Sequence, residues 1–272
     1  MDRTLMTSTD TFTPSHRGGS GTPLVLLHGF TDTWRTWELV LPALEAQHDV
    51  FAPTLPGHAG GAPIPDDPSI ENLLDIVEAQ LDEAGIEKAH IAGNSLGGYL
   101  ALHLAARGRA ESVVGLAPAG GWAVGDESYF AVLDNFVNLK QMVVGALPHV
   151  EAMVASPEGR RAATQLITVA YEHIPADLVA HQVRGVAGCE VDPFIEYVKR
   201  EGWSLDAAAI TCPVRIAWGT NDLILPPGVA DVRFHTEWLP QAEYVTLENV
   251  GHLPQLDVPE QAAATILEAI AG

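Results

Sequence analysis

The chain has 272 residues, of which 47% are hydrophobic, which suits one large domain with a packed core, with or without a sizeable insertion. Its 14 lysines and arginines stand against 35 aspartates and glutamates, giving a formal net charge of −21. A chain this acidic repels nucleic acids and anionic membrane surfaces, so neither is an expected partner. The two cysteines, Cys189 and Cys212, match no metal-ligand spacing.

Residues 1–19 are polar and contain no apolar core of a secretory signal. No segment approaches 18 uninterrupted apolar residues, so no membrane span is expected. These features favour a cytoplasmic enzyme. The sequence does not distinguish a monomer from a homodimer.

In chain order, the first expected element is a buried strand at 24–28, because this run is continuously apolar. The glycine-rich segment 18–21 before it predicts a hairpin turn from an earlier edge strand. Helical spacing follows at 37–46, and a second short strand is expected at 50–53. Ser69 is the expected N-cap of an amphipathic helix whose apolar face runs from Ile70 to Leu81.

Strands are next expected at 88–92 and 111–117, with a helix after Ser95 between them. The alternation stops at Pro118, and 121–204 reads as helical, irregular and rich in aromatic residues. Strands resume at 213–218 and 243–247, and a final helix is expected at 258–271. Asp257 is its predicted N-cap, with Glu260 as the capping-box partner.

Alternating strands and helices predict an α/β fold with a mostly parallel, doubly wound sheet. We expect residues 1–120 and 205–272 to form the core. The interruption predicts that residues 121–204 form an inserted helical cap.

The run Gly93-Asn94-Ser95-Leu96-Gly97 lies between an expected strand and an expected helix. In this G-x-S-x-G context the serine sits on a sharp, strained turn with its hydroxyl exposed. The following helix N-terminus favours a developing negative charge. A glycine-rich turn with an incidental serine is the alternative interpretation.

A serine hydroxyl needs an adjacent base, and that base needs an orienting group. Asp222 and His252 each follow an expected strand, where the carboxyl ends of strands meet in an open α/β sheet. They also follow Ser95 in the order serine, acid, histidine. Asp206 and Asp257 are alternative acids.

At these residues the chain resembles the α/β-hydrolase family, from Leu24 to the C-terminus. The marks are His28-Gly29-Phe30, Leu55-Pro56-Gly57-His58, the Ser95 turn, Asp222 and Gly251-His252. Thr54 departs from the pattern, since many relatives have an aspartate there.

The resemblance implies a role for each of these residues. It makes Ser95 the nucleophile, His252 the general base and Asp222 the residue that orients the imidazole. The backbone N–H groups of Phe30 and Leu96 would form an oxyanion hole, and His28 would be structural.

A serine nucleophile implies an acyl-enzyme, so the substrate carries an ester, thioester, lactone or amide, with an ester as the default. Together with the aromatic residues of 121–204, this favours a small or medium, largely apolar carboxylic ester. Relatives that open epoxides or displace halide use an aspartate nucleophile instead. The alternative is a carbon–carbon hydrolase of the kind that cleaves vinylogous diketones, with Arg184 as the candidate for holding a substrate carboxylate. A lactonase, a perhydrolase and a non-catalytic ligand receptor remain further alternatives. No metal or organic cofactor is implied.

The aromatic residues of 121–204 predict a mainly apolar pocket. Its candidate binding residues are Trp122, Phe130, Met142 and Arg184.

Overall fold

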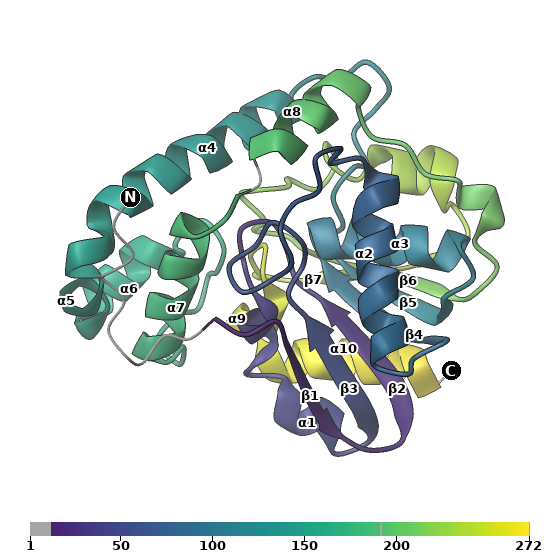
Figure 1. Ribbon diagram of the computed structural model, residues 1–272, viewed down its shortest axis with the longest axis horizontal. Coiled ribbons are helices and arrows are strands. Elements are labelled where there is room, and N and C mark those ends of the chain that lie inside the picture. Colours follow the sequence, from purple (N-terminus) through teal and green to yellow (C-terminus); the bar gives the residue numbers. More distant parts are fainter. Residues whose placement is uncertain (1–11, 191, 272) are drawn as a thin grey trace.

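The computed structural model describes residues 12–190 and 192–271. Most of the polar segment 1–19, for which no secretory signal is expected, lies outside the described residues. Within these ranges seven strands form one sheet in the order β1-β3-β2-β4-β5-β6-β7 (Figure 1). All neighbouring strands are parallel except β1 and β3. The predicted α/β fold with a mostly parallel sheet is therefore confirmed. The strands are β1 (Ser15–Gly19), β2 (Thr22–Leu27), β3 (His48–Pro53), β4 (Ala89–Asn94), β5 (Ala110–Leu116), β6 (Val214–Gly219) and β7 (Glu243–Leu247).

The predicted hairpin between the first two strands is wrong. β1 pairs with β3 in antiparallel fashion, and β3 lies between β1 and β2 in the sheet. The last four residues of β2 are buried, as in a central strand with a neighbour on each side. The glycine turn instead carries the chain across the start of β3. A Cβ on Gly19 would lie 2.1 Å from the carbonyl oxygen of His48.

Helices cover both faces of the sheet (Figure 1). Val25 and Leu27 pack with α2 (Ile70–Glu83) and α3 (Leu96–Ala106), while Leu24 and Leu26 pack with α1 (Leu41–Glu45) and α10 (Pro259–Ala271). Ser69 caps α2 as expected, because its hydroxyl accepts a hydrogen bond from the backbone N–H of Asn72 at 3.4 Å. Between β2 and β3 the helix expected at 37–46 is divided into a 3₁₀ turn, η1 (Trp34–Trp37), and the short α1.

Five α-helices lie between β5 and β6 in the described chain, and we call them the inserted helices. They gather mainly beside the sheet, with α4 and α8 along the top in Figure 1. Val143, Val150 and Leu178 of this group share an apolar cluster with Leu253 and Leu256. Among the described residues, none of the helices combines the length and apolarity that crossing a membrane requires. The inserted helices are α4 (Tyr129–Ala146), α5 (Val150–Ala155), α6 (Pro157–Thr164), α7 (Ala176–Ala187) and α8 (Asp192–Glu201).

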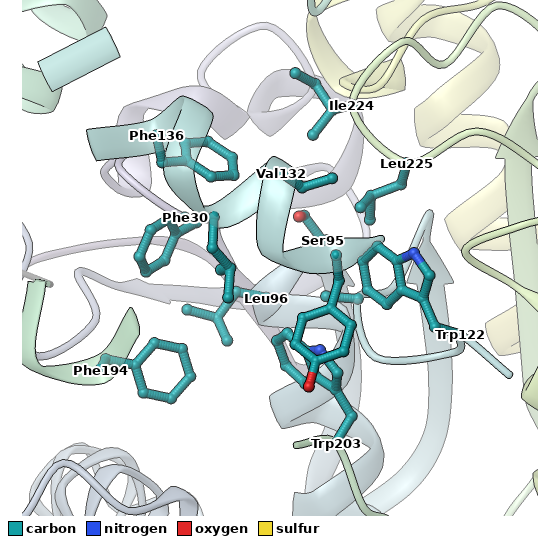
Figure 2. A pocket seen from close by; sticks show the side chains of 13 residues that line it. Phe30, Ser95, Leu96, Trp122, Val132, Phe136, Phe194, Trp203, Ile224 and Leu225 are labelled. Carbon is teal, nitrogen blue, oxygen red and sulfur yellow. The ribbon is translucent and has the colours of Figure 1, made fainter. Parts of the chain in front are cut away.

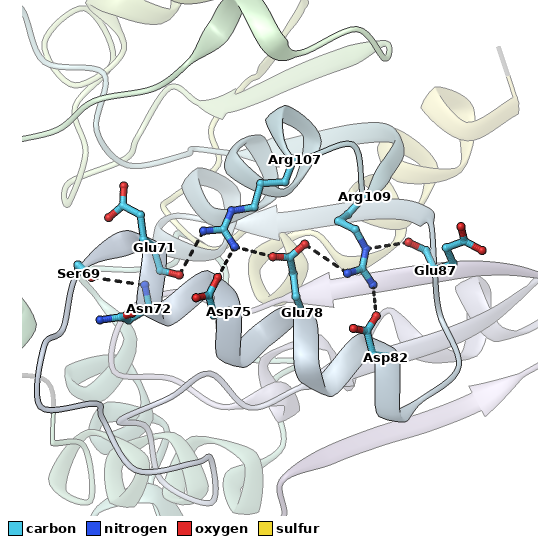
Figure 3. Close-up of polar contacts among 9 residues, drawn as sticks. All are labelled: Ser69, Glu71, Asn72, Asp75, Glu78, Asp82, Glu87, Arg107 and Arg109. Atoms are coloured by element: carbon cyan, nitrogen blue, oxygen red, sulfur yellow. Dashed lines mark hydrogen bonds and ion pairs between the residues drawn. The ribbon is translucent and has the colours of Figure 1, made fainter.

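A row of ion pairs joins α2 to the turn between α3 and β5 (Figure 3). Glu78 bridges both arginines of the turn, at 2.5 Å from Nη1 of Arg107 and 3.2 Å from Nη1 of Arg109. Asp75 pairs with Arg107 and Asp82 with Arg109, each at 2.6 Å. Through its two ion pairs, the carboxylate of Glu78 connects α2 to the turn that precedes β5. The inserted helices follow β5 in the chain.

Candidate active site

Ser95 stands alone between β4 and α3 with φ of 54° and ψ of −118°. This positive φ is unfavourable for a residue with a side chain. The turn is tight enough that a Cβ on Gly93 would lie 2.2 Å from the carbonyl oxygen of Gly97. The N–H of Leu96 lies in the first turn of α3, where a helix offers its amides no internal acceptor. The turn therefore holds the serine beside backbone N–H groups that point away from the helix.

Asp222 and His252 form a buried hydrogen-bonded pair. Nδ1 of His252 lies 2.7 Å from Oδ2 of Asp222, and both residues are only 3% exposed. The other carboxylate oxygen accepts the backbone N–H groups of Ile224 at 2.9 Å and Leu225 at 2.7 Å. These bonds fix the carboxylate. Because an ionised carboxylate can only accept hydrogen bonds, the imidazole donates through Nδ1, which leaves Nε2 available as a base.

The loop 28–33 after β2 lies directly against the serine turn. A Cβ on Gly29 would come within 2.9 Å of Oδ1 of Asn94 and 3.3 Å of Cβ of Ser95. His28 holds the loop in place, because Nδ1 donates to the carbonyl of Gly29 and Nε2 accepts the N–H of Leu55, each at 2.8 Å. Burial and the neighbouring His58 lower the pKa of His28 well below its ordinary value, which keeps it neutral. This geometry suits a structural histidine that shapes the loop carrying Phe30.

Asp32 is a buried carboxylate in the same loop. It accepts the N–H of Thr33 at 2.8 Å and Nε2 of Gln182, from α7, at 3.2 Å. Burial outweighs these bonds and raises the pKa of Asp32 to about 6. The loop thus carries an acid whose charge changes in a mildly acidic medium and whose partner belongs to an inserted helix.

A cavity of about 400 Å³, counted with its part open to solvent, lies above Ser95. Figure 2 shows Phe30, Phe136, Trp122 and Leu225 arranged around the serine side chain. None of the lining side chains is charged, and the indole N–H of Trp203 is buried without a hydrogen-bond partner in the described chain. The cavity suits an apolar group attached to a reactive carbonyl. Its lining residues are Phe30, Ser95, Leu96, Ala119, Trp122, Tyr129, Val132, Leu133, Phe136, Phe194, Trp203, Ile224 and Leu225.

Of the four candidate binding residues, only Trp122 lines this cavity. Phe130 is half-buried outside the lining, with its ring 4.8 Å from that of Tyr129. The side chain of Met142 faces solvent with 67% of its surface exposed, because the other face of α4 packs inward. Arg184 is not part of the lining and forms an ion pair with Glu151 of α5.

Several cavity residues are absent from the sequence-based candidates. Val132, Leu133 and Phe136 come from α4, where the sequence does not reveal which face meets the core. Ile224 and Leu225 lie two and three residues after Asp222, so their nearness to the candidate acid in the sequence is a usable signal.

Neither alternative acid takes the place of Asp222 beside the imidazole of His252. Asp206 is exposed at the start of a short 3₁₀ turn, where its side chain makes no capping bond. The predicted capping role of Asp257 is wrong. Its carboxylate accepts the backbone N–H groups of Gly251, Val169 and Ala170 at 2.6 to 2.9 Å, so it is occupied away from α10.

No group of three or more histidine, cysteine, aspartate or glutamate side chains is placed to hold a metal ion within the ranges 12–190 and 192–271. Two buried carboxylates of the site, Asp222 and Asp32, are engaged by other groups. Asp222 binds His252 and two amides, and Asp32 binds Thr33 and Gln182.

Known proteins resemble the chain along most of its length. An epoxide hydrolase, EphH of Mycobacterium tuberculosis, is 32% identical over 204 residues, which cover 73% of this chain and 93% of that protein. The dihydrolipoyllysine-residue acetyltransferase component of the acetoin cleaving system of Pseudomonas putida is 30% identical over 253 residues. That match covers 92% of this chain, which spans only 64% of the relative's length. A pimeloyl-[acyl-carrier protein] methyl ester esterase of Aromatoleum aromaticum is 26% identical over 268 residues, covering 92% of this chain and 98% of the esterase.

The family model described as "Alpha/beta hydrolase family" matches residues 24–265, which include the serine turn, Asp222 and His252. This range begins in β2 and ends in α10, so it takes in most of the sheet and the inserted helices. The chain therefore belongs to the alpha/beta hydrolase family.

Proposed function

We propose that the protein is a serine hydrolase that cleaves carboxylic esters with a largely apolar acyl group through an acyl-enzyme. The observation that carries the proposal is the buried Asp222–His252 hydrogen bond of 2.7 Å. The carbonyl of this histidine is held by Asn94, the residue before a serine that lines an uncharged cavity. A histidine oriented by a carboxylate is the arrangement that activates a serine hydroxyl.

In the proposed reaction, Oγ of Ser95 attacks the ester carbonyl while Nε2 of His252 takes the hydroxyl proton. The developing oxyanion is stabilised by the backbone N–H groups of Phe30 and Leu96. His252 then gives the proton to the departing alcohol, and a water molecule hydrolyses the acyl-enzyme by the same proton transfers in reverse. Asp222 stabilises the imidazolium formed in each half.

One relative is named as an epoxide hydrolase, but epoxide opening is not the reaction that a serine at position 95 favours. Attack of a serine hydroxyl on an epoxide carbon would form an alkyl ether, and an ether offers water no carbonyl to attack. An acyl ester on Ser95 is hydrolysed readily with the same histidine. The relative named as a methyl ester esterase supports the ester assignment.

The carbon–carbon hydrolase alternative relied on Arg184 as a partner for a substrate carboxylate. Arg184 lies outside the cavity lining and pairs with Glu151, and no lining residue carries a charge. A substrate with a carboxylate beside its reactive carbonyl would therefore lose water without gaining an ionic partner. This observation favours uncharged esters.

The size and chemistry of the cavity limit the acyl group. The space of about 400 Å³ includes a part open to solvent, and bulky aromatic and aliphatic side chains bound it. The inserted helices contribute Phe136 and Phe194, so they would act as the cap that sets specificity. We expect short or medium aliphatic and aryl acyl groups to be preferred over long chains and over charged ones.

A panel of p-nitrophenyl esters tests this function. The acyl group would run from acetyl to lauroyl, with hemisuccinyl as a charged member and one vinylogous diketone included. We expect the highest kcat/KM for an uncharged short or medium acyl group. Activity should be lost in Ser95→Ala and retained in Ser128→Ala, since Ser128 is exposed at the start of α4. Turnover of the diketone alone, or activity retained in Ser95→Ala, would reject the proposal.

A further inference from the structure

The segment that follows His252 is hydrogen-bonded to the inserted helices. The N–H of Leu253 donates to the carbonyl of Ile167 at 3.0 Å. Nε2 of His173 lies 2.7 Å from the carbonyl oxygen of Leu256, two residues beyond the start of α9 (Pro254–Asp257). The loop with the candidate base therefore contacts the segment between α6 and α7 through one main-chain hydrogen bond and one from the side chain of His173.

Asp257 is the centre of this junction. Its side chain is buried, with the residue only 2% exposed, and Oδ1 accepts the N–H of Ala170 at 2.7 Å. Oδ2 accepts two amides, those of Val169 at 2.9 Å and Gly251 at 2.6 Å. Hydrogen bonds to a carboxylate are shorter and stronger than neutral ones. One carboxylate thus joins the residue before His252 to two residues of the inserted segment.

The two segments are also in direct steric contact. A Cβ on Gly251 would lie 2.7 Å from the carbonyl oxygen of Ile167 and 3.0 Å from Cα of Thr168. Glycine allows this approach because it has no side chain there. The main chain beside His252 therefore has little room to shift unless the 167–170 turn shifts with it.

The 167–170 turn is in turn fixed to the inserted helices. Nη1 of Arg161, in α6, donates to the carbonyls of Thr168 and Val169 at 3.1 Å each. Leu253 and Leu256 belong to the apolar cluster that contains Val143 of α4. α4 also carries Phe136, which lines the cavity. Contacts are thus continuous from the wall of the cavity to the histidine loop.

We propose that Asp257 is a positioning residue that couples the placement of the inserted helices to the alignment of His252. This inference rests on the proposed function in assigning His252 the role of base, but the physical junction does not depend on turnover. Asp257 acts through the loop and does not replace Asp222, which already holds Nδ1 of the imidazole. The position of the cavity wall and the position of His252 are thereby held constant relative to each other.

The first test is Asp257→Asn, which keeps the side-chain size but replaces one acceptor oxygen with an amide donor. We expect kcat for an uncharged p-nitrophenyl ester to fall about 10- to 100-fold, with KM changed less than about threefold, because the lost alignment affects the proton-transfer step. Asp206→Asn is the matched control and should match wild type, since Asp206 is exposed. A folded Asp257→Asn protein with kcat within twofold of wild type would overturn the proposal.

Amide hydrogen exchange provides a readout that does not need turnover. In Asp257→Asn, segments 249–254 and 167–171 should both exchange faster, while β4 and α3 remain protected. Faster exchange in only one of the two segments would contradict the coupling even if no ester were ever hydrolysed. Failure of the wild-type protein on every ester, with the coupled exchange present, would reject the proposed function and leave the junction standing.

A second variant keeps the test usable if Asp257→Asn does not fold. Arg161→Gln removes the guanidinium that fastens Thr168 and Val169 without touching the histidine loop. We expect a smaller fall in kcat, about three- to tenfold, in the same direction and again with little change in KM. A folded Arg161→Gln protein whose kcat is unchanged would show that the inserted segment does not position His252.

Discussion

The side-chain amide of Asn94 donates one hydrogen bond to the main-chain carbonyl of His252 at 3.0 Å and another to that of Leu116 at 3.0 Å. Asn94 is 1% exposed and immediately precedes Ser95. Asn94 is the neighbour of the candidate nucleophile in the sequence, and its side chain holds the main chain of the candidate base. A single residue therefore links the turn of Ser95 to the loop of His252. Both N–H groups of the Asn94 side-chain amide donate to carbonyls. No other side chain of this size offers two such donors from one nitrogen.

Asn94→Ala tests this tie. The change removes the side-chain donor to the carbonyl of His252, at a cost of about 1–3 kcal/mol, while the carbonyl of Leu116 keeps the N–H of Ser95 at 3.0 Å. We expect kcat to fall at least about tenfold because the loop of His252 loses its anchor beside Ser95. Ester kinetics and thermal unfolding measure the two effects. Asn94→Asp should fare no better, since a carboxylate cannot donate. An unchanged kcat in a folded Asn94→Ala protein would show that the tie has no catalytic role.

Asp222→Asn should reduce activity severely while leaving the fold intact. An amide of the same shape favours the wrong imidazole tautomer, which lowers kcat by about 10⁴-fold in triads of this kind. The N–H groups of Ile224 and Leu225 can still find the amide oxygen. Circular dichroism checks the fold, and stopped or continuous ester assays measure kcat. Retention of more than a tenth of wild-type kcat would assign the orienting role to another group.

Asp32 predicts a pH dependence of stability. Burial raises the pKa of Asp32 in the folded protein from an ordinary 3.8 to about 6. Between those values the folded state binds a proton that the unfolded state has released. The free energy of unfolding therefore falls as the pH rises through this window, by about 3 kcal/mol in total, and is flat on either side.

Asp32→Asn should remove that contribution. The variant should match wild type near pH 4 and exceed it above pH 7, as measured by denaturant unfolding at each pH. Its amide can donate to Oε1 of Gln182, which is buried without a partner in the described ranges. Asp206→Asn, at an exposed position, should show no such divergence. A stability difference that is the same at pH 4 and pH 8 would contradict a raised pKa.

Glu78 should contribute modestly to stability through its two arginines (Figure 3). Partly exposed ion pairs are worth little singly, so we expect Glu78→Gln to cost about 1 kcal/mol at low salt. The difference from wild type should shrink in 1 M NaCl, where screening acts over about 3 Å. Glu83→Gln, at an exposed position of the same helix, should cost less. An effect that does not depend on salt would indicate lost packing instead of lost charge.

Local patterns explain why much of the fold could be predicted. The apolar runs that became β2 and β5 are buried strands, and Ser69 caps α2, because strand burial and capping depend on residues close in sequence. Asp222 and His252 were candidates for a similar reason, since each follows a strand of a parallel sheet.

Contacts between distant segments explain the rest. The place of β1 depends on β3 filling the position beside β2, which no pattern in residues 15–27 encodes. Asp257 has a good capping sequence, yet three amides from Gly251 and the 169–170 turn compete for its carboxylate. Met142 and Phe136 lie on one helix, and only packing against the core decides which of them meets the cavity.

The most direct test of the central claim is to look for the acyl group on Ser95. The protein would be mixed with an excess of a p-nitrophenyl ester, quenched in acid within milliseconds to seconds, and analysed by intact mass and peptide mapping. A fluorophosphonate probe would serve as an irreversible counterpart. We predict a mass increase equal to one acyl group on the peptide containing Ser95, absent in Ser95→Ala and present in Ser128→Ala. Ester turnover with the label on another residue, or with labelling that persists in Ser95→Ala, would contradict the account.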